Sequence, residues 1–121
     1  MDKKICLDTD ICIEFVKGNK DFYSFFEIDY VPYVTSITVF ELLLRKTNLD
    51  KMEFLLSKVN ILNFDEISAR ESSHIYKELE KSGDLIEFRD IFIALTCIIN
   101  NCTLLTLNKK HFSRIKNLKL L

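Results

Sequence analysis

Short apolar runs alternate with longer amphipathic stretches along this chain, and the two patterns predict different elements. Runs rich in apolar and β-branched residues predict strands at 3–8, 30–36, 59–64, 102–107 and 118–121. Helical spacing predicts helices over 11–28 (broken near Gly18 and Asn19), 37–46, 50–58, 66–82 and 89–101. The helix over 66–82 is amphipathic, with Ile67, Ile75 and Leu79 on its apolar side. Near-continuous apolar strands joined by helices indicate a mainly parallel, roughly five-stranded sheet covered on both faces.

The composition is that of a globular protein. The 121 residues are 48% hydrophobic and 29% charged, and two glycines and one proline leave little room for linkers. We therefore assign residues 1–121 to one domain. No apolar run reaches the roughly 20 residues of a membrane span, and the first residues do not resemble a signal peptide. We expect a cytoplasmic protein that does not contact a membrane.

The four cysteines predict buried thiols rather than a metal or redox site. Cys6, Cys12, Cys97 and Cys102 each lie in an apolar context, and none has Cys-x-x-Cys spacing. Unpaired buried thiols are typical of proteins in a reducing compartment.

Charge is distributed unevenly, although the formal net charge is only −1. Residues 63–90 contain eight acidic and four basic residues, whereas residues 91–121 contain no acid. Five basic residues lie in that last segment: Lys109, Lys110, Arg114, Lys116 and Lys119. This basic segment is either a solvated surface or a patch that faces phosphate groups.

Acidic side chains follow the ends of several predicted strands. Asp8 and Asp10 come after the first strand, Glu41 lies one turn into the helix after the second, and Asp90 begins a later helix. Ligands of parallel sheets bind beyond the carboxyl ends of the strands, where Thr106 and Asn108 also fall. Converging carboxylates repel one another unless a cation neutralises them, and hard oxygen ligands favour Mg²⁺ or Mn²⁺.

Each of these acids also has a purely structural interpretation. Asp8 could cap a helix, and Glu41 could close a capping box that begins at Thr38. Asp90 could serve the helix dipole, as could Glu87 or Asp84.

Four motifs in order resemble the PIN-domain ribonucleases, and most closely the VapC toxins of type II toxin–antitoxin systems. They are "LDTDICIEFVKG", "TSITVFELL", "GDLIEFRDIFIALTCIINN" and "TLNKKHFSRI". The resemblance covers nearly the whole chain and implies a PIN-like three-layer α/β/α fold. It also implies metal-dependent cleavage of RNA by an activated water.

The resemblance assigns roles to individual residues. Asp8 and Asp90 would be direct ligands of Mg²⁺ or Mn²⁺, and Glu41 would hold a metal-bound water or a second ion. Thr9 and Thr106 fall where the family has small hydroxyl residues that orient the carboxylates.

Two positions depart from the family pattern. Asp10 stands where Asn is usual, and we expect it to cap the following helix. Asn108 stands where many members have a fourth acid, so we expect weaker occupancy of a second ion. His111 is expected to pack or to contact the RNA backbone rather than to act as a base.

The resemblance also implies partners. VapC toxins are typically homodimers, are covered by a VapB antitoxin, and reach promoter DNA only through that antitoxin. An apolar groove for such a partner is suggested by five clustered aromatic residues: Phe15, Phe22, Tyr23, Phe25 and Phe26.

Two alternatives stay open at the level of the sequence. A degenerate PIN domain could bind RNA or a protein without cutting, as Asn108 allows. The "DTD" stretch could instead belong to a haloacid-dehalogenase-type phosphatase, with Asp8 as nucleophile and Asp10 as general acid.

Overall fold

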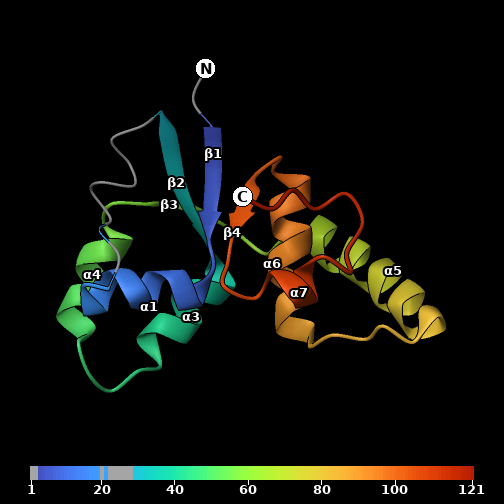
Figure 1. Cartoon of the computed structure of the whole chain (residues 1–121), viewed down its shortest axis with the longest axis horizontal. Coiled ribbons are helices and arrows are strands. Elements are labelled where there is room, and N and C mark those ends of the chain that lie inside the picture. The colour runs from blue at the N-terminus through green and yellow to red at the C-terminus, as the bar shows by residue number, and fades with distance from the viewer. Residues whose placement is uncertain (1–2, 20, 22–28) are drawn as a thin grey trace.

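A computed structural model of the protein describes residues 3–19, 21 and 29–121 (Figure 1). Its strands are β1 (Lys3–Leu7), β2 (Tyr30–Thr35), β3 (Asn60–Leu62) and β4 (Thr103–Leu105). Its helices are α1 (Thr9–Lys17), α3 (Ser36–Leu43), α4 (Leu49–Leu56), α5 (Glu66–Ser82), α6 (Phe88–Ile99) and α7 (Lys109–Phe112).

The sheet is parallel throughout, with the strand order β3-β2-β1-β4. Cys6 in β1 lies opposite both Tyr33 in β2 and Leu104 in β4, so β1 is an inner strand. Ile5, Cys6 and Leu7 are at most 1% exposed, as expected for a strand covered on both faces. The predicted mainly parallel sheet is confirmed, and its carboxyl ends meet at one edge.

The predicted strand count is slightly wrong, because the described residues form four strands rather than five. The segment expected at 118–121 makes an isolated parallel bridge between Leu104 and Leu120. Only Leu104 supplies backbone partners: its N–H donates to Lys119, and its carbonyl accepts from Leu121. A bridge through one residue is too short to count as a strand.

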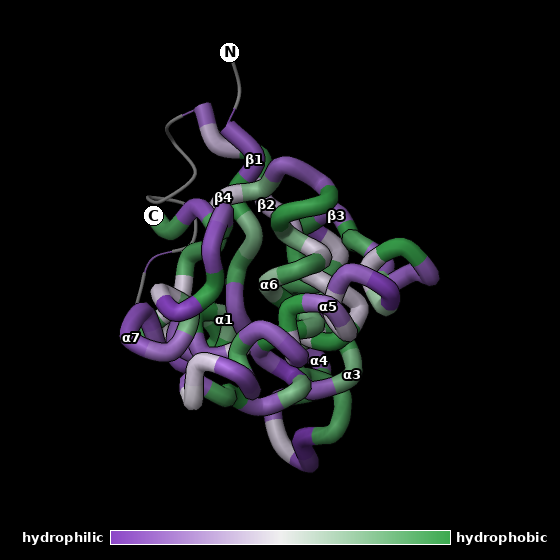
Figure 2. The backbone as a smooth tube through the Cα atoms, turned by 90° about the vertical axis from the view of Figure 1, so that its right-hand side faces the viewer, coloured by the Kyte–Doolittle hydropathy of each residue, from purple (hydrophilic) through white to green (hydrophobic). Residues whose placement is uncertain are grey.

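Helices cover both faces of the sheet, and two buried clusters form the core. Ile5 and Leu7 pack on the side of α1, α3 and α4, whereas Cys6 packs on the side of α5 and α6. This alternation follows from the two-residue period of a strand. In Figure 2 the apolar tube of α6 contrasts with the polar tube of α7. The three-layer α/β/α fold is confirmed.

The helix over 66–82 has the predicted bounds, and Ile75 and Leu79 face the core as predicted, but Ile67 does not. Ile67 is 60% exposed, whereas Ser68, Ser72 and Leu79 are buried and Ile75 is half-buried. Ser68 and Ser72, rather than Ile67, are buried on α5, which packs against α6. The helix ends at Gly83, whose φ of 74° is the left-handed conformation that favours glycine.

Two further predictions concern α1 and its continuation. The break near Gly18 is confirmed, since Gly18 caps the end of α1 with a φ of 80°. The rest of the helical prediction over 11–28, and four of the five clustered aromatics, fall on 20 and 22–28, outside the described residues.

The prediction of buried thiols is confirmed. All four cysteines are free and buried. No helix among the described residues is long and apolar enough to cross a membrane.

Candidate active site

Three acidic side chains from separate segments meet at the carboxyl edge of the sheet. Asp8 directly follows β1, Glu41 lies in α3, and Asp90 lies in the first turn of α6. Figure 1 shows that α1, α3 and the start of α6 converge below the tips of β1 and β2. Asp8 and Asp90 are only 1% and 4% exposed, so their carboxylates are largely withdrawn from water.

The guanidinium of Arg89 joins these three acids. Its Nε donates to Glu41 Oε2 at 2.6 Å and its Nη2 donates to Asp8 Oδ1 at 2.9 Å. Its Nη1 donates to Asp90 Oδ1. One planar guanidinium thus reaches all three carboxylates through three different nitrogens, whereas a lysine would have only one nitrogen to share among them.

Sequence reasoning missed Arg89, although one signal pointed to it. The N-terminal turn of a helix repels positive side chains, yet Arg89 occupies that turn of α6 beside Asp90. An unfavourably placed cation indicates compensating acids nearby. Its partners Glu41 and Asp8 are 48 and 81 residues away in the chain, so only the fold reveals them.

Burial and charge act in opposite directions on this cluster. Burial raises the pKa of Asp90, and the adjacent Arg89 opposes that rise. Burial alone would lower the pKa of Arg89, but Glu41 and Asp8 outweigh it and leave that pKa raised. The guanidinium therefore stays charged at any physiological pH.

Two threonine hydroxyls hold the outer oxygens of the carboxylates. Thr106 Oγ1 donates to Asp8 Oδ2 at 2.7 Å, and Thr9 Oγ1 donates to Glu41 Oε1 at 2.7 Å. Thr9 Oγ1 also lies 3.0 Å from Thr38 Oγ1. These bonds fix the direction in which each carboxylate faces.

The expectation that Asp10 caps α1 is wrong. Asp8 is the N-cap of α1, and its Oδ1 accepts from the Thr9 backbone N–H at 2.8 Å. Asp10 lies inside the first turn, where its Oδ2 accepts from the Leu107 N–H at 3.2 Å. Burial and the charge of Asp8 raise the pKa of Asp10. Asp10 therefore ties α1 to the segment after β4, while Asp8 both caps the helix and faces the cluster.

The capping-box interpretation of Glu41 is also wrong. The N-cap of α3 is Thr35, whose Oγ1 accepts from the Thr38 N–H at 3.2 Å. Thr38 is thus already inside the helix, and Glu41 bonds to Thr9 and Arg89 instead.

Asn108 and His111 lie at the rim of the cluster. The Asn108 N–H donates to Thr106 Oγ1 at 3.0 Å, and its side-chain Nδ2 lies 2.9 Å from His111 Nδ1. His111 Nδ1 is 3.9 Å from Asp90 Oδ2. The Asn108 amide therefore orients a histidine that borders the acids.

The chemistry of these donors suits a hard divalent cation, but their present arrangement is that of an ion-pair network. Carboxylate oxygens are the ligands that Mg²⁺ and Mn²⁺ prefer. Across residues 3–19, 21 and 29–121, no three His, Cys, Asp or Glu side chains are grouped as a metal site. The guanidinium of Arg89 occupies the space between the three acids.

A parallel sheet between two layers of helices, with acids gathered at its carboxyl edge, is the architecture expected of a PIN domain. The chain belongs to the PIN-domain family, whose model matches residues 5–118. This match places it there rather than among haloacid-dehalogenase-type phosphatases.

Similar proteins and solved structures support the same family assignment. The chain is 37% identical over 89 residues to Ribonuclease VapC3 of Methanocaldococcus jannaschii, covering 73% of this chain and 92% of that protein. It resembles the crystal structure of VapBC2 from Rickettsia felis bound to a promoter DNA fragment (TM-score 0.86, 29% identity, 98% and 97% of the chains). It also resembles DNA-bound VapBC from Salmonella typhimurium (TM-score 0.89, 26% identity, 98% and 97%).

Proposed function

We propose that this protein is a metal-dependent endoribonuclease of the VapC type and the toxin of a type II toxin–antitoxin system. The observation that carries the proposal is the meeting of Asp8, Glu41 and Asp90 at the carboxyl edge of the sheet. The relative named Ribonuclease VapC3 supports RNA as the substrate class.

Asp8 and Asp90 would hold Mg²⁺ or Mn²⁺ directly, and Glu41 would act through water or a second ion. When bound, the ion supplies water activation and stabilises the charge that collects on the phosphate during cleavage. The protein contributes orientation, because Thr106 and Thr9 hold the outer oxygens of Asp8 and Glu41. Asn108 adds no negative charge at the rim, which favours one ion over two.

Basic residues beside this edge would bind the RNA backbone. Lys109 and Lys110 lie in α7, which begins directly after Asn108. They are exposed and are not paired with an acid in any ion pair recorded for the described residues. Of the two interpretations of the basic segment, we therefore favour phosphate binding for α7.

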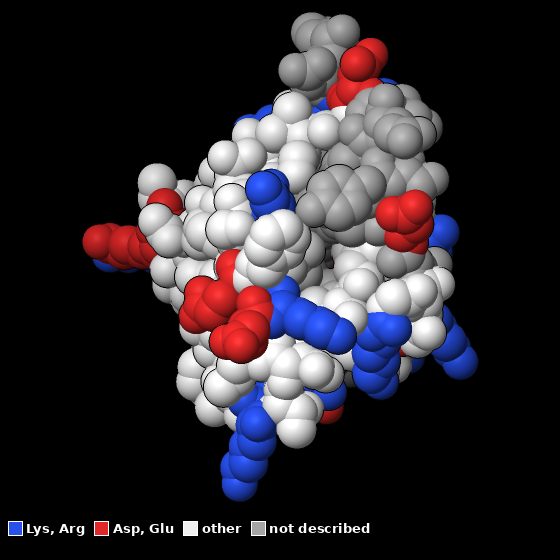
Figure 3. Space-filling model, turned by 90° about the vertical axis from the view of Figure 1, so that its left-hand side faces the viewer, with Lys and Arg blue, Asp and Glu red and all other residues white. Residues whose placement is uncertain are grey.

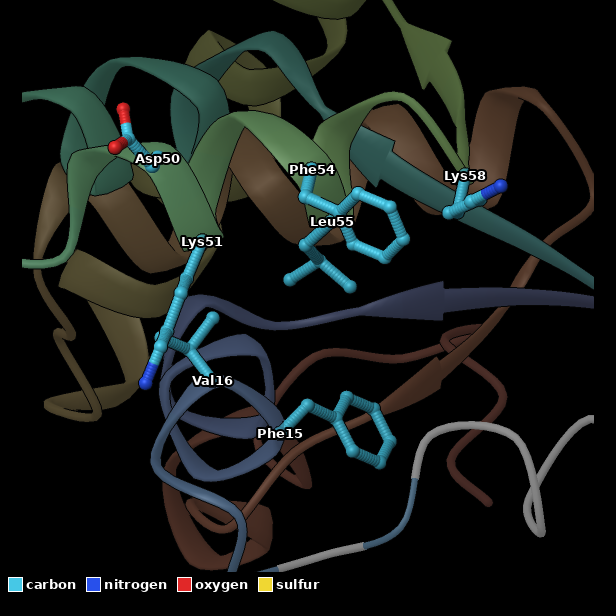
Figure 4. Close-up of a pocket in the computed structure, with 7 residues that line it drawn as sticks. All are labelled: Phe15, Val16, Asp50, Lys51, Phe54, Leu55 and Lys58. Atoms are coloured by element: carbon cyan, nitrogen blue, oxygen red, sulfur yellow. The ribbon is translucent and has the colours of Figure 1, made fainter.

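A VapB-type antitoxin would dock in an apolar groove between α1 and α4. Phe15 and Val16 of α1 face Phe54 and Leu55 of α4 across this groove, and charged residues form its rim (Figure 4). Figure 3 shows this side of the molecule, on which basic and acidic groups lie between areas of uncharged surface. The two neighbours described as VapBC complexes support an antitoxin as the occupant.

Under the same proposal the protein forms a homodimer and acts in the cytoplasm. It would contact promoter DNA only through the antitoxin. Free buried thiols fit a reducing compartment. Sedimentation of the purified chain at two concentrations tests the dimer.

A second candidate is a degenerate PIN domain that binds RNA or a protein without cutting. Asn108 in place of a fourth acid, and the guanidinium seated among the other three, favour it. Both candidates share the same surface but differ in whether the acids are needed for a chemical step.

Cleavage of a short single-stranded RNA distinguishes them. The assay uses Mg²⁺, Mn²⁺ or EDTA with the wild type and with Asp8→Asn and Asp90→Asn. We expect metal-dependent cutting that each substitution lowers by at least about 100-fold. Asp84→Asn is the matched control, because Asp84 is exposed and precedes α6. RNA that is bound but left intact by all variants would support the degenerate domain.

A further inference from the structure

Among the ion pairs of the described residues, only Arg89 contacts all three acids. His111 lies 3.9 Å from one of them, Asp90. Its three nitrogens each take one oxygen, from Asp8, Glu41 and Asp90 respectively. These acids come from three segments that are far apart in the chain, so the guanidinium holds them together.

The carboxylate oxygens of Asp8 and Glu41 that do not bind Arg89 also accept hydrogen bonds. Asp8 Oδ2 accepts from Thr106, and Glu41 Oε1 accepts from Thr9. Both oxygens of each of these two carboxylates therefore already have a protein donor. Each oxygen can accept a second partner, but Arg89 occupies the position that joins the three acids. A cation that bridges them therefore competes with Arg89, which also repels it by charge.

The position of Arg89 permits such an exchange. Its side chain is 29% exposed, whereas the side chains of Asp8 and Asp90 are 2% and 5% exposed. The guanidinium can thus turn toward water while the carboxylates stay in place.

We propose that Arg89 is an internal counter-ion that holds the three carboxylates in the metal-free protein and that a divalent cation displaces on binding. This inference rests on the proposed function, because it assumes that the acids hold a metal. Cation and guanidinium compete for the same oxygens, so each weakens the binding of the other by an equal factor. Arg89 is thereby a positioning residue that sets the metal concentration at which the site fills.

Mn²⁺ binding measured by isothermal titration calorimetry tests the competition. We expect Arg89→Ala to bind Mn²⁺ about tenfold more tightly than the wild type, a typical size for coupling between two ligands. Arg70→Ala is the matched control: it removes the same charge from an exposed pair with Glu66 on α5. Unchanged or weaker Mn²⁺ binding by Arg89→Ala overturns the inference.

Nuclear magnetic resonance of the arginine Nε–H groups tests the displacement in the wild-type protein. The chain has four arginines, so Arg89 is assigned by the signal that is lost in Arg89→Lys. We expect Mg²⁺ to shift this signal and to accelerate its exchange with water, while the Arg70 signal stays unchanged. An Arg89 signal that does not move at saturating Mg²⁺ overturns the inference even if Arg89→Ala fails to fold.

The two proposals fail in different ways. If the wild type binds Mn²⁺ and Asp8→Asn does not, but Arg89→Ala binds as the wild type does, only the counter-ion role fails. If none of these proteins binds Mn²⁺, the metal site of the proposed function fails and the counter-ion role with it.

Discussion

The Thr106 hydroxyl donates a 2.7 Å hydrogen bond to Asp8 Oδ2 and so joins the ends of β4 and β1. The two residues are 98 positions apart in the sequence, and both are buried. A buried carboxylate oxygen needs such a donor, because it has lost water as a partner. The bond thus couples the pairing of the two strands to the direction of the Asp8 carboxylate.

Removal of this hydroxyl should harm both stability and activity. Thr106→Val keeps the shape of the side chain but leaves Asp8 Oδ2 without its donor, at a cost of about 1.5–3 kcal/mol in the free energy of unfolding. Urea denaturation measures the loss, and the RNA assay should show slower cutting. Thr106→Ser keeps the hydroxyl and should behave nearly as the wild type. Equal stability of the valine and serine variants would contradict this role.

Asn108→Asp should strengthen the metal site. The substitution places a carboxylate beside His111 and near Asp90, while the Asn108 backbone bond to Thr106 is independent of the side chain. We expect tighter Mn²⁺ binding in calorimetry, by about 5-fold or more, because another hard oxygen ligand with a charge is added. Asn101→Asp, at the far end of α6, controls for the added charge. Identical binding isotherms for the two variants would argue against Asn108 as part of the site.

Phe112 should be essential for the position of α7. Its side chain is fully buried in the cluster that contains Cys6 and Leu104, although α7 has only four residues. Phe112→Ala should destabilise the protein by about 3–5 kcal/mol because it leaves a cavity, and Phe112→Leu should cost less. Chemical denaturation measures both. A loss below about 1 kcal/mol for the alanine variant would show that the core closes around the cavity.

Asp65 should make the stability of α5 depend on pH in the acidic range. Its carboxylate accepts from the Ser68 N–H at 2.9 Å, and this bond lowers the pKa of Asp65 below the usual 3.8. A lowered folded pKa means that the stabilisation is present above the unfolded pKa and is lost as pH falls through the folded pKa.

Asp65→Asn tests this linkage, since asparagine caps helices equally well but does not titrate there. Urea midpoints of the wild type should fall more steeply below about pH 4 than those of Asp65→Asn. Asp65→Ala should lower the midpoint at neutral pH as well. Parallel pH profiles of the wild type and the asparagine variant would exclude the cap as the source.

The sequence by itself determined the order of elements and the acids to inspect. Apolar runs in β1, β2 and β4 and the helical spacing of α5 and α6 depend on local periodicity, which a linear sequence displays. The carboxyl ends of parallel strands always share an edge, so Asp8 and Glu41 could be grouped before any contact was known. Asp90 follows a helix and a loop rather than a strand, and only the resemblance to the PIN-domain family added it.

Only the tertiary structure decided what lies between those acids and which neighbours hold them. The fork of Arg89, the carboxylate to which each hydroxyl of Thr9 and Thr106 donates, and the exposure of Ile67 all depend on distances between segments that are far apart in the chain. Local propensity carries no information about such distances, because packing of α6 against α3 and α5 fixes them. The pattern of the chain therefore predicts where the charges gather, and the packed fold determines which charge balances them.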